Sequence, residues 1–431
     1  MLIRHLSKMA QPSGKVLEGV FAVSKPPHLS SAQVLRDLQH KFAESKTFAP
    51  LLQNTRSAQE EQERYQRKRR KRDNDQVFKM GHGGTLDPLA TGILIVGIGR
   101  GTKHLSDFLA CKKTYETVVL FGKNTDTYDV MGKVVAEAPT ENITEGLVEE
   151  QMEKFRGRHK QIPPIYSAIK IDGMKLYDYA RSGKALPRQL ESRDVEISDC
   201  SLLEYFEPGQ HDFRWPAEQA SDEEKAVARK LMDGAEATKK SIVAHSGQAT
   251  SDKDAKKPVS NAAINSIPRK DKAALHTHHL PTQESSPANA PAASIRLTVS
   301  SGFYVRSFCY DLGVACGSYG TMAALVRSQQ ADFTITDPAP DDMATAVTYE
   351  DLEAGEEVWG QKISSVLERW MEKHPAASTQ DQIDNRDRRD TRWNHSKRGG
   401  GGMKRSWDDR GGHGDRNSGA RQRRNSSSPE I

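Results

Sequence analysis

The stretch that most constrains this chain is Lys79–Gly92, which reads KMGHGGTLDPLATG. Its glycines permit positive φ angles and close approaches of the backbone. Pro88 fixes its own φ angle and pushes the preceding Asp87 into an extended conformation. The apolar run Ile93–Ile98 follows and is predicted to be a strand, with a short helix over 102–109. The sequence therefore predicts a stiff loop that presents one carboxylate at a defined angle in front of a buried strand.

Several interpretations of this loop compete. An isolated Asp-Pro in a loop usually caps the next element. The glycine spacing does not match a dinucleotide-binding loop, and the Lys-Ser/Thr ending of a phosphate-binding loop is missing. The full string GHGGTLDPLATG resembles the active-site loop of the TruB family of tRNA pseudouridine synthases. This resemblance implies that Asp87 is the catalytic carboxylate.

Two downstream strings resemble the same family. In the predicted strand Lys112–Gly122, the string KTY places Tyr115 where the family has the ring that packs on the target base, although strand tyrosines are usually core residues. The polar turn Thr125–Gly132, TDTYDVMG, supports this register and lacks the remaining ligands of a Ca²⁺ loop. The string GFYVRSFCYDLG implies that Arg306 is the partner of Asp87, whereas a helix-start arginine taken alone is usually an exposed ion-pair partner.

The resemblance also implies a set of RNA-binding side chains. His82 is placed to enter the gap that a flipped base leaves, and a structural loop histidine is the equally weighted alternative. Lys25 follows the predicted strand Gly19–Val23 and precedes a Ser-capped helix over 32–42, where it is a candidate for a structural or an RNA-contacting role. The full predicted set is His82, Lys25, Tyr304, Leu325 and Arg327.

The implied reaction is the isomerisation of uridine to pseudouridine, which needs no redox step, metal or phosphoryl donor. We therefore expect no cofactor and no metal. A carboxylate such as Asp87 would act as a nucleophile or as a base, and attack on the base, attack on the sugar and removal of a sugar proton all stay open. A buried, bidentate Arg306 would favour its charged form and orient it.

Three segments differ from the rest in composition. Residues 46–76 are highly charged without an apolar period and are predicted to be a solvated insertion, whose basic cluster Arg67–Arg72 is a nuclear localisation signal, an RNA contact or a plain linker. Residues 209–293, rich in Ala, Ser, Lys, Asp and Pro, are predicted to be a disordered insertion with a local helix over 217–232. Residues 376–431 read as a disordered Arg/Gly-rich tail with non-specific nucleic-acid affinity, and 1–14 as a flexible N-terminus.

Without these segments roughly 245 residues are left, enough for one large domain with one core. The catalytic domain is expected to span 15–375. Its strand and helix patterns indicate mixed α/β content. The resemblance implies the α+β pseudouridine synthase fold, in which a central, mostly antiparallel mixed sheet carries flanking helices and a cleft runs across it.

Charge and cysteine content bear on partners and compartment. The net charge is +5, and because the part from Asp381 onward holds 13 Lys/Arg and 8 Asp/Glu, the rest of the chain is balanced. An RNA-binding surface on the core must then be a local patch. The four cysteines include no close pair, which fits a reduced, intracellular protein, and no apolar run approaches the ~18 residues of a membrane span.

The resemblance implies the T-arm of tRNA as partner, with messenger RNA as a further candidate, no membrane partner and a monomer. The basic cluster and the acid-free N-terminus favour the nucleus, the mitochondrion or both. Two other functions stay open: a guide-RNA-dependent pseudouridine synthase of the dyskerin type, and a non-catalytic RNA chaperone on the same fold.

Overall fold

A computed structural model describes residues 14–65, 77–182, 186–188, 190–226 and 287–376. The chain divides into two compact units, Met1–His374 and Pro375–Ile431, and every element described below belongs to the first. The predicted flexible N-terminus up to residue 13, the basic cluster Arg67–Arg72, residues 227–286 of the second insertion and the tail from residue 377 lie outside the described residues.

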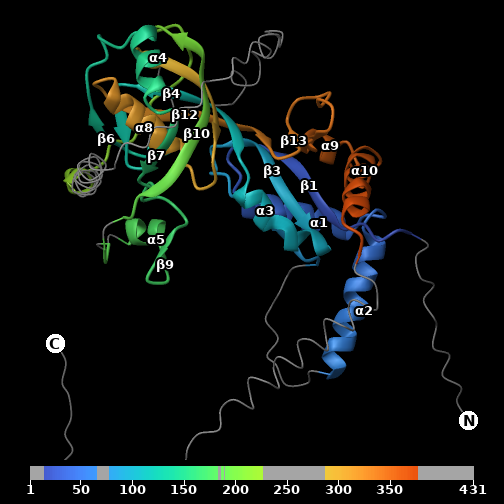
Figure 1. Cartoon of the computed structure of the whole chain (residues 1–431). Coiled ribbons are helices and arrows are strands. Elements are labelled where there is room, and N and C mark those ends of the chain that lie inside the picture. Colours follow the sequence, from blue (N-terminus) through green and yellow to red (C-terminus); the bar gives the residue numbers. More distant parts are fainter. Residues whose placement is uncertain (1–13, 66–76, 183–185, 189, 227–286, 377–431) are drawn as a thin grey trace, which may run out of the picture. The chain divides into compact units, whose positions relative to one another are not determined.

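A ten-stranded sheet organises the described residues (Figure 1). Its strand order is β1-β3-β12-β4-β11-β10-β7, and neighbours along this order are antiparallel except β3 and β12, which are parallel. This confirms the expected fold, a mostly antiparallel central sheet with flanking helices. The strands are β1 (Gly19–Lys25), β3 (Thr91–Ile98), β12 (Gly320–Gln330), β4 (Lys113–Phe121), β11 (Ala292–Val299), β10 (Arg193–Phe206) and β7 (Gly157–Gln161), joined off this path by β2 (Met80–His82), β13 (Phe333–Thr334) and β14 (Ala344–Thr345).

Two small hairpins and the helices complete the unit. The hairpins pair β5 (Lys123–Thr125) with β6 (Val134–Glu137), and β8 (Lys170–Ile171) with β9 (Met174–Lys175). The helices are α1 (Ser31–Ala43), α2 (Ala49–Tyr65), α3 (Leu105–Ala110, preceded by the 3-10 helix Gly99–His104), α4 (Glu145–Glu153), α5 (Leu176–Arg181), α8 (Val305–Ala315), α9 (Tyr349–Glu353) and α10 (Glu356–Lys373). None of the helices in the described ranges has an apolar stretch that would cross a bilayer.

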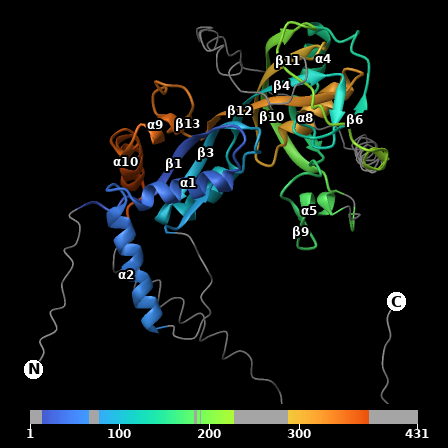
Figure 2. The ribbon, with the colours of Figure 1, turned by 180° about the vertical axis from the view of Figure 1, so that it is seen from behind.

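Strands β1 and β3 are covered on both faces. Successive side chains of a strand point to opposite faces of the sheet, and both strands are apolar at successive positions. In β1, Phe21 and Val23 face a core formed with α1 and α10, whereas Val20 and Ala22 face a second cluster that Leu105 and Phe108 of α3 join. Figures 1 and 2 show α3 and α1 on opposite faces of these strands. The apolar face of α10 docks here, with Trp359, Ile363, Leu367 and Trp370 buried.

The other end of the sheet has its own core. Side chains of β4, β10, β11 and β12 pack there with α4 and α8, and they include Val119, Ile295, Leu297, Phe308 and Met322. The two ends of the sheet meet where β3 and β12 pair, at Thr91 opposite Val326 and Gly92 opposite Arg327. The loop that carries Asp87 leads into β3 at this junction, so both halves of the fold contribute to its surroundings.

Both predicted insertions contain more structure than their composition indicated. Helix α2 forms in the first, and Phe48 and Leu51 at its start are buried in the core next to α1 and α10. The prediction that this segment is wholly solvated was therefore wrong, because the short apolar run TFAPLL anchors an otherwise polar helix. In the second, residues 209–226 and 287–291 are described and pack on the domain, and a helical turn spans residues 222–226.

Candidate active site

The loop that carries Asp87 is fixed through its backbone. The Ser31 hydroxyl, in the first turn of α1, accepts a hydrogen bond from the Leu86 N–H (2.9 Å) and donates one to the Leu86 carbonyl (3.2 Å). On the other side of Asp87, the Pro88 carbonyl accepts from the His28 N–H (2.8 Å). Because both neighbours of Asp87 are hydrogen-bonded to the chain around α1, the backbone that carries the Asp87 carboxylate is held in place. The Asp87 side chain is 37% exposed.

Lys25 and Arg327 lie behind this loop, each with 1% of the residue exposed. The Lys25 ammonium donates to the carbonyls of Pro26 (2.8 Å), Leu29 (2.7 Å) and Pro88 (3.1 Å). The Arg327 guanidinium donates from Nε to the Ile93 carbonyl (2.7 Å) and from Nη2 to the Gly84 carbonyl (3.0 Å). Both residues are RNA-binding candidates from the sequence. Both are buried and direct donors at backbone carbonyls around the loop, which gives them a structural role, and a contact of either residue with RNA stays a prediction.

Gln330 supports the same loop from the end of β12. Its amide nitrogen donates to the carbonyls of Gly83 (2.7 Å) and Phe108 (2.8 Å), so it joins the loop to α3. At the other end of the loop, Gly92 has φ = +88°, and a Cβ atom there would lie 2.4 Å from the Arg327 carbonyl oxygen. This is the close approach of two strands that the glycines of the motif predict.

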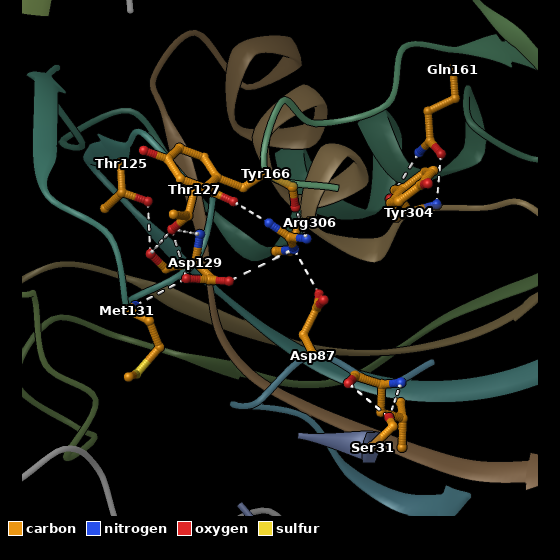
Figure 3. A network of polar contacts seen from close by, with 11 residues as sticks. Ser31, Asp87, Thr125, Thr127, Asp129, Met131, Gln161, Tyr166, Tyr304 and Arg306 are labelled. Atoms are coloured by element: carbon orange, nitrogen blue, oxygen red, sulfur yellow. Dashed lines mark hydrogen bonds and ion pairs between the residues drawn. The ribbon is translucent and has the colours of Figure 1, made fainter. Parts of the chain in front are cut away.

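Arg306, in the first turn of α8, meets Asp87 from the opposite half of the sheet (Figure 3). Its Nε lies 2.8 Å from Asp87 Oδ2, and its side chain is 6% exposed. The contact is an ion pair whose angle is not that of a hydrogen bond. Nη1 and Nη2 donate to the carbonyls of Thr127 (2.8 Å) and Tyr166 (2.9 Å). The predicted partnership is therefore present, but it is not the bidentate fork expected, because both Nη groups are held by backbone carbonyls.

Asp129 brings a second carboxylate to the same guanidinium, and the sequence did not predict this role. Its Oδ2 lies 3.7 Å from Arg306 Nε, and Oδ1 accepts from the Thr127 hydroxyl (2.7 Å) and the Met131 N–H (3.0 Å). Burial raises the pKa of Asp129 to about 6, against the opposing effects of Arg306 and the Thr127 hydrogen bond. The signal lay in the turn TDTYDVMG, whose second aspartate precedes an apolar residue and a glycine.

Tyr304 stands at the N-cap of α8, two residues before Arg306. Its N–H donates to Gln161 Oε1 (2.7 Å), and Gln161 Nε2 donates back to the Tyr304 carbonyl (3.0 Å), as Figure 3 shows. Gln161, 2% exposed at the end of β7, thus fixes the start of the helix that carries Arg306. Sequence reasoning missed this residue because a glutamine before a Pro-Pro pair carries no signal of its own.

Tyr115 and Leu325 lie on neighbouring strands and join one apolar cluster with Leu86 and Leu89 of the catalytic loop. Tyr115 is 8% and Leu325 7% exposed. The predicted stacking ring and the residues Leu86 and Leu89 of the catalytic loop thus belong to the same core. The roles of both side chains toward RNA stay predictions.

His82 ends β2, directly before the glycines of the loop. Its Nδ1 is buried and has no hydrogen-bond partner among the described residues. Burial, and next the positive charge of Arg327, lower the pKa of His82, so the neutral imidazole is favoured. A neutral ring with an unpaired nitrogen beside the loop is compatible with the predicted insertion into an RNA stack.

The described residues contain no cluster of His, Cys, Asp or Glu side chains with the arrangement of a metal site. A cavity of about 380 Å³ lies between α3 and α10, but it is lined by Phe108, Trp370 and their neighbours and does not include Asp87 or Arg306. The groups that the described site offers for chemistry are the two carboxylates, the guanidinium and the tyrosines.

The sequence was compared with known proteins. The profile described as "TruB family pseudouridylate synthase (N terminal domain)" matches residues 69–221. tRNA pseudouridine synthase 4 of Schizosaccharomyces pombe is 38% identical over 337 residues, covering 74% of this chain and 80% of that protein. Its namesake in Saccharomyces cerevisiae is 32% identical over 368 residues, covering 82% and 85%. tRNA pseudouridine synthase B of Fusobacterium nucleatum is 30% identical over 319 residues, covering 74% and 70%.

Among solved structures, a Cbf5-Nop10-Gar1 complex gives a TM-score of 0.39 at 16% identity, covering 81% of this chain and 61% of that chain. The two yeast relatives are matched over most of their own length. On this sequence similarity, the chain belongs to the TruB family of pseudouridine synthases.

Proposed function

We propose that this tRNA pseudouridine synthase isomerises uridine 55 in the T-loop of tRNA, with Asp87 as its catalytic carboxylate. One observation carries the assignment of Asp87. It is a partly exposed acid on a loop held by its own backbone, and its carboxylate lies 2.8 Å from the buried guanidinium of Arg306. A fixed, charged and accessible carboxylate is what the reaction requires.

The reaction breaks the N1–C1′ bond of the uridine, rotates the base and forms a C5–C1′ bond. C5 then loses its proton and the freed N1 gains one, so that the composition of the nucleoside is unchanged. Asp87 acts on the sugar or the base while the glycosidic bond is broken. Arg306 orients the Asp87 carboxylate, because its guanidinium is buried and its Nε lies 2.8 Å from Asp87 Oδ2. These groups are in place before the substrate binds, so little reorganisation is needed during the reaction.

Asp129 has a different task in this scheme. It is 6% exposed, and its carboxylate is bonded to the Thr127 hydroxyl and the Met131 N–H, so little of it is available to a substrate. Its Oδ2 lies 3.7 Å from Nε of Arg306, the same nitrogen that faces Asp87. Asp129 thereby helps to aim Arg306 at Asp87, which makes it a positioning residue.

The target uridine has to leave the T-loop to reach Asp87. Extruding a base costs a few kcal/mol, and the enzyme offsets this cost by stacking and by filling the vacated space. We assign the stacking to the ring of Tyr115 and the filling to the neutral imidazole of His82. Tyr304 and Leu325 are proposed to line the same cleft.

Asp87→Asn tests the assignment. The amide keeps the size of the side chain but cannot act as nucleophile or base, so we expect unchanged tRNA binding and no release of tritium from C5-labelled uridine in a tRNA transcript. Asp107→Asn is the matched control, because Asp107 is a 76% exposed aspartate on α3 and its replacement changes the net charge equally. Turnover by Asp87→Asn would refute the role of Asp87.

The other two functions predict different results in the same assay. A guide-dependent enzyme needs a second RNA, whereas we expect purified protein to modify an unmodified tRNA transcript with no other RNA present. A chaperone without catalysis would refold tRNA equally well with Asp87→Asn and release no tritium in either form.

A further inference from the structure

The polar turn between β5 and β6 supplies much of what holds Arg306. We call Thr125–Gly132 the catalytic turn. Its Thr127 carbonyl and its Asp129 carboxylate both contact the guanidinium. The turn closes at Asp126, whose N–H donates to the Lys133 carbonyl (3.1 Å) and whose Oδ1 accepts from the Lys133 N–H (2.9 Å). Lys133 and Val134 are therefore the neck of the catalytic turn.

The first part of the second insertion lies along this neck. We call residues 215–226 the brace. Val134 pairs with the brace in both directions, since its N–H donates to the Glu218 carbonyl and its carbonyl accepts from the Ala220 N–H, both at 3.0 Å. The pairing is a parallel bridge between Val134 and Gln219, and Ala220 is buried at 5% exposure. The brace thus adds a short backbone pairing to the outer side of β6.

Side chains reinforce the same contact. The Lys133 ammonium lies 2.9 Å from a carboxylate oxygen of Glu218 and 2.9 Å from one of Glu224. These acids sit on both sides of the bridge and raise the pKa of Lys133. At the start of the brace, the ring of Trp215 lies under the ammonium of Lys123 in β5, 5.9 Å from the ring centre. The brace therefore contacts both strands of the hairpin that carries the catalytic turn.

A second set of bonds closes the insertion at its base, so that the brace does not depend on the residues beyond it. His211 Nε2 donates to the Ala290 carbonyl (2.8 Å), and His211 Nδ1 accepts from the Phe213 N–H (3.2 Å). The Ala288 N–H donates to the Phe213 carbonyl (2.8 Å). We call these contacts the clasp. It joins the two ends of the insertion next to β10 and β11.

We propose that the brace is a positioning element for catalysis: it fixes the neck of the catalytic turn and thereby the place of Arg306 relative to Asp87. The inference rests on the proposed function, because it assigns a catalytic consequence to the contact between Arg306 and Asp87. Two carbonyls and two carboxylates surround Arg306, and two of these four groups, the Thr127 carbonyl and the Asp129 carboxylate, belong to the catalytic turn. A displaced turn would therefore remove both from the guanidinium. Misplacement of a catalytic group by about 1 Å is enough to cost about 100-fold in rate.

Two deletions separate the brace from the rest of the insertion. One removes 227–286 and keeps both brace and clasp, and the other removes 215–286 and keeps only the clasp. Each gap is closed by a flexible Gly/Ser linker of about ten residues. We expect the first deletion to keep kcat on tRNA transcript within about twofold and the second to lower it by tenfold or more, with KM for tRNA nearly unchanged in both.

Point substitutions test the same contact more gently. An exposed ion pair contributes little to stability, so Lys133→Met is expected to lower kcat by only about two- to fivefold. Glu150→Gln is the matched control, because it removes an exposed pair of similar length (3.0 Å, to Lys154) outside the hairpin and the brace. Charge reversal provides the rescue: Lys133→Glu combined with Glu218→Lys and Glu224→Lys should recover most of the kcat that Lys133→Glu loses.

The outcomes distinguish the proposal from its competitors. If the 215–286 deletion retains full kcat, the brace has no catalytic role and the proposal is overturned. If the deletion instead raises KM for tRNA and changes how KM depends on salt, the brace contacts RNA, and the proposal is also overturned. If the deletion acts through the catalytic turn, its loss of kcat and that of Asp129→Asn must be non-additive when the two changes are combined. If the two losses of kcat add and the melting temperature falls, the brace has only a structural role and the proposal is overturned. Failure of the proposed function itself would appear as a full chain that releases no tritium.

Discussion

At the scale of single residues, the environment of Arg306 explains why a buried cation is tolerated. Its guanidinium is surrounded by two carboxylates and two backbone carbonyls, so each of its three nitrogens lies next to a carboxylate or a carbonyl. Removing one partner of a buried ion pair leaves the other charge buried and uncompensated, which typically costs about 3–5 kcal/mol of stability. The charge pattern therefore stabilises one arrangement of the site and penalises its alternatives.

Lys25→Met removes the ammonium that serves three carbonyls behind the catalytic loop. We expect the free energy of unfolding to fall by about 1–3 kcal/mol, because buried carbonyl groups lose their donor. We also expect kcat to fall, since Pro88, the neighbour of Asp87, is one of the residues released. Chemical denaturation and single-turnover assays measure the two effects. Lys79→Met, at an exposed lysine before β2, is the control that should change neither.

The pKa of Asp129 predicts how stability depends on pH. Burial raises its pKa from 3.8 to about 6, so the native protein binds this proton more tightly than the unfolded chain. The stability that this proton provides is complete below the unfolded pKa and is lost as pH rises through about 6. In denaturation experiments, the unfolding free energy of wild type minus that of Asp129→Asn should therefore fall by about 1–2 kcal/mol between pH 4.5 and pH 7.5. A constant or rising difference would contradict the raised pKa.

At the scale of elements, the junction of β3 and β12 decides where the catalytic loop sits. The two strands are parallel and pair only at Thr91 and Gly92, opposite Val326 and Arg327. The approach is close because Gly92 has no side chain. The loop in front of it is then held from β12 by Arg327 and Gln330, and from the chain around α1 by Ser31 and Lys25.

Gly92→Ala should separate these two strands. The added Cβ would lie 2.4 Å from the Arg327 carbonyl oxygen, and the φ angle of +88° is strained for alanine. We expect a loss of at least about 2 kcal/mol in unfolding free energy and a large loss of kcat. Gly146→Ala in α4 is the opposite case, because nothing lies within 4 Å of its added Cβ and alanine favours a helix. Thermal unfolding should show Gly92→Ala destabilised and Gly146→Ala unchanged or more stable.

At the scale of the whole molecule, the catalytic domain has two main cores on one sheet, with the site where they meet. One core is built from β1, β3, α1 and α10, and the other from β4, β10, β11, β12, α4 and α8. The loop with Asp87 leads into β3 of the first core, while its residues Leu86 and Leu89 pack in the second core. Helix α8, which carries Arg306, belongs to the second core. Ten strands in one sheet join these cores, which gives a rigid base for the ion pair between them.

The C-terminal part of the chain carries the whole net charge of +5. Removing everything after Pro375 should weaken tRNA binding and flatten its dependence on salt, because fewer phosphate contacts release fewer counterions. The modified position should stay the same, since the site lies in the catalytic domain. Binding isotherms at several salt concentrations and mapping of the modified uridine check both points. A changed position would assign recognition to the tail.

The motifs around Asp87, Tyr115 and Arg306 identified the family and the catalytic candidates because they are local strings whose glycines, prolines and charges have few other uses. The apolar runs of β1 and β3 were also readable, since a short apolar run bounded by turn residues indicates a buried strand. The same reasoning underestimated α2 and the start of the second insertion, where a few apolar residues are diluted by many charged ones.

Tertiary structure alone decided which polar residues serve the site and how. Lys25 and Arg327 face backbone carbonyls, Arg306 approaches Asp87 through Nε, and Asp129 joins them from a turn that the sequence assigned no role. The physical reason is that a long polar side chain has many rotamers, and the one it adopts depends on which acceptors the rest of the fold leaves unpaired. The local sequence names the groups for catalysis, and only the assembled sheet determines which of them meet.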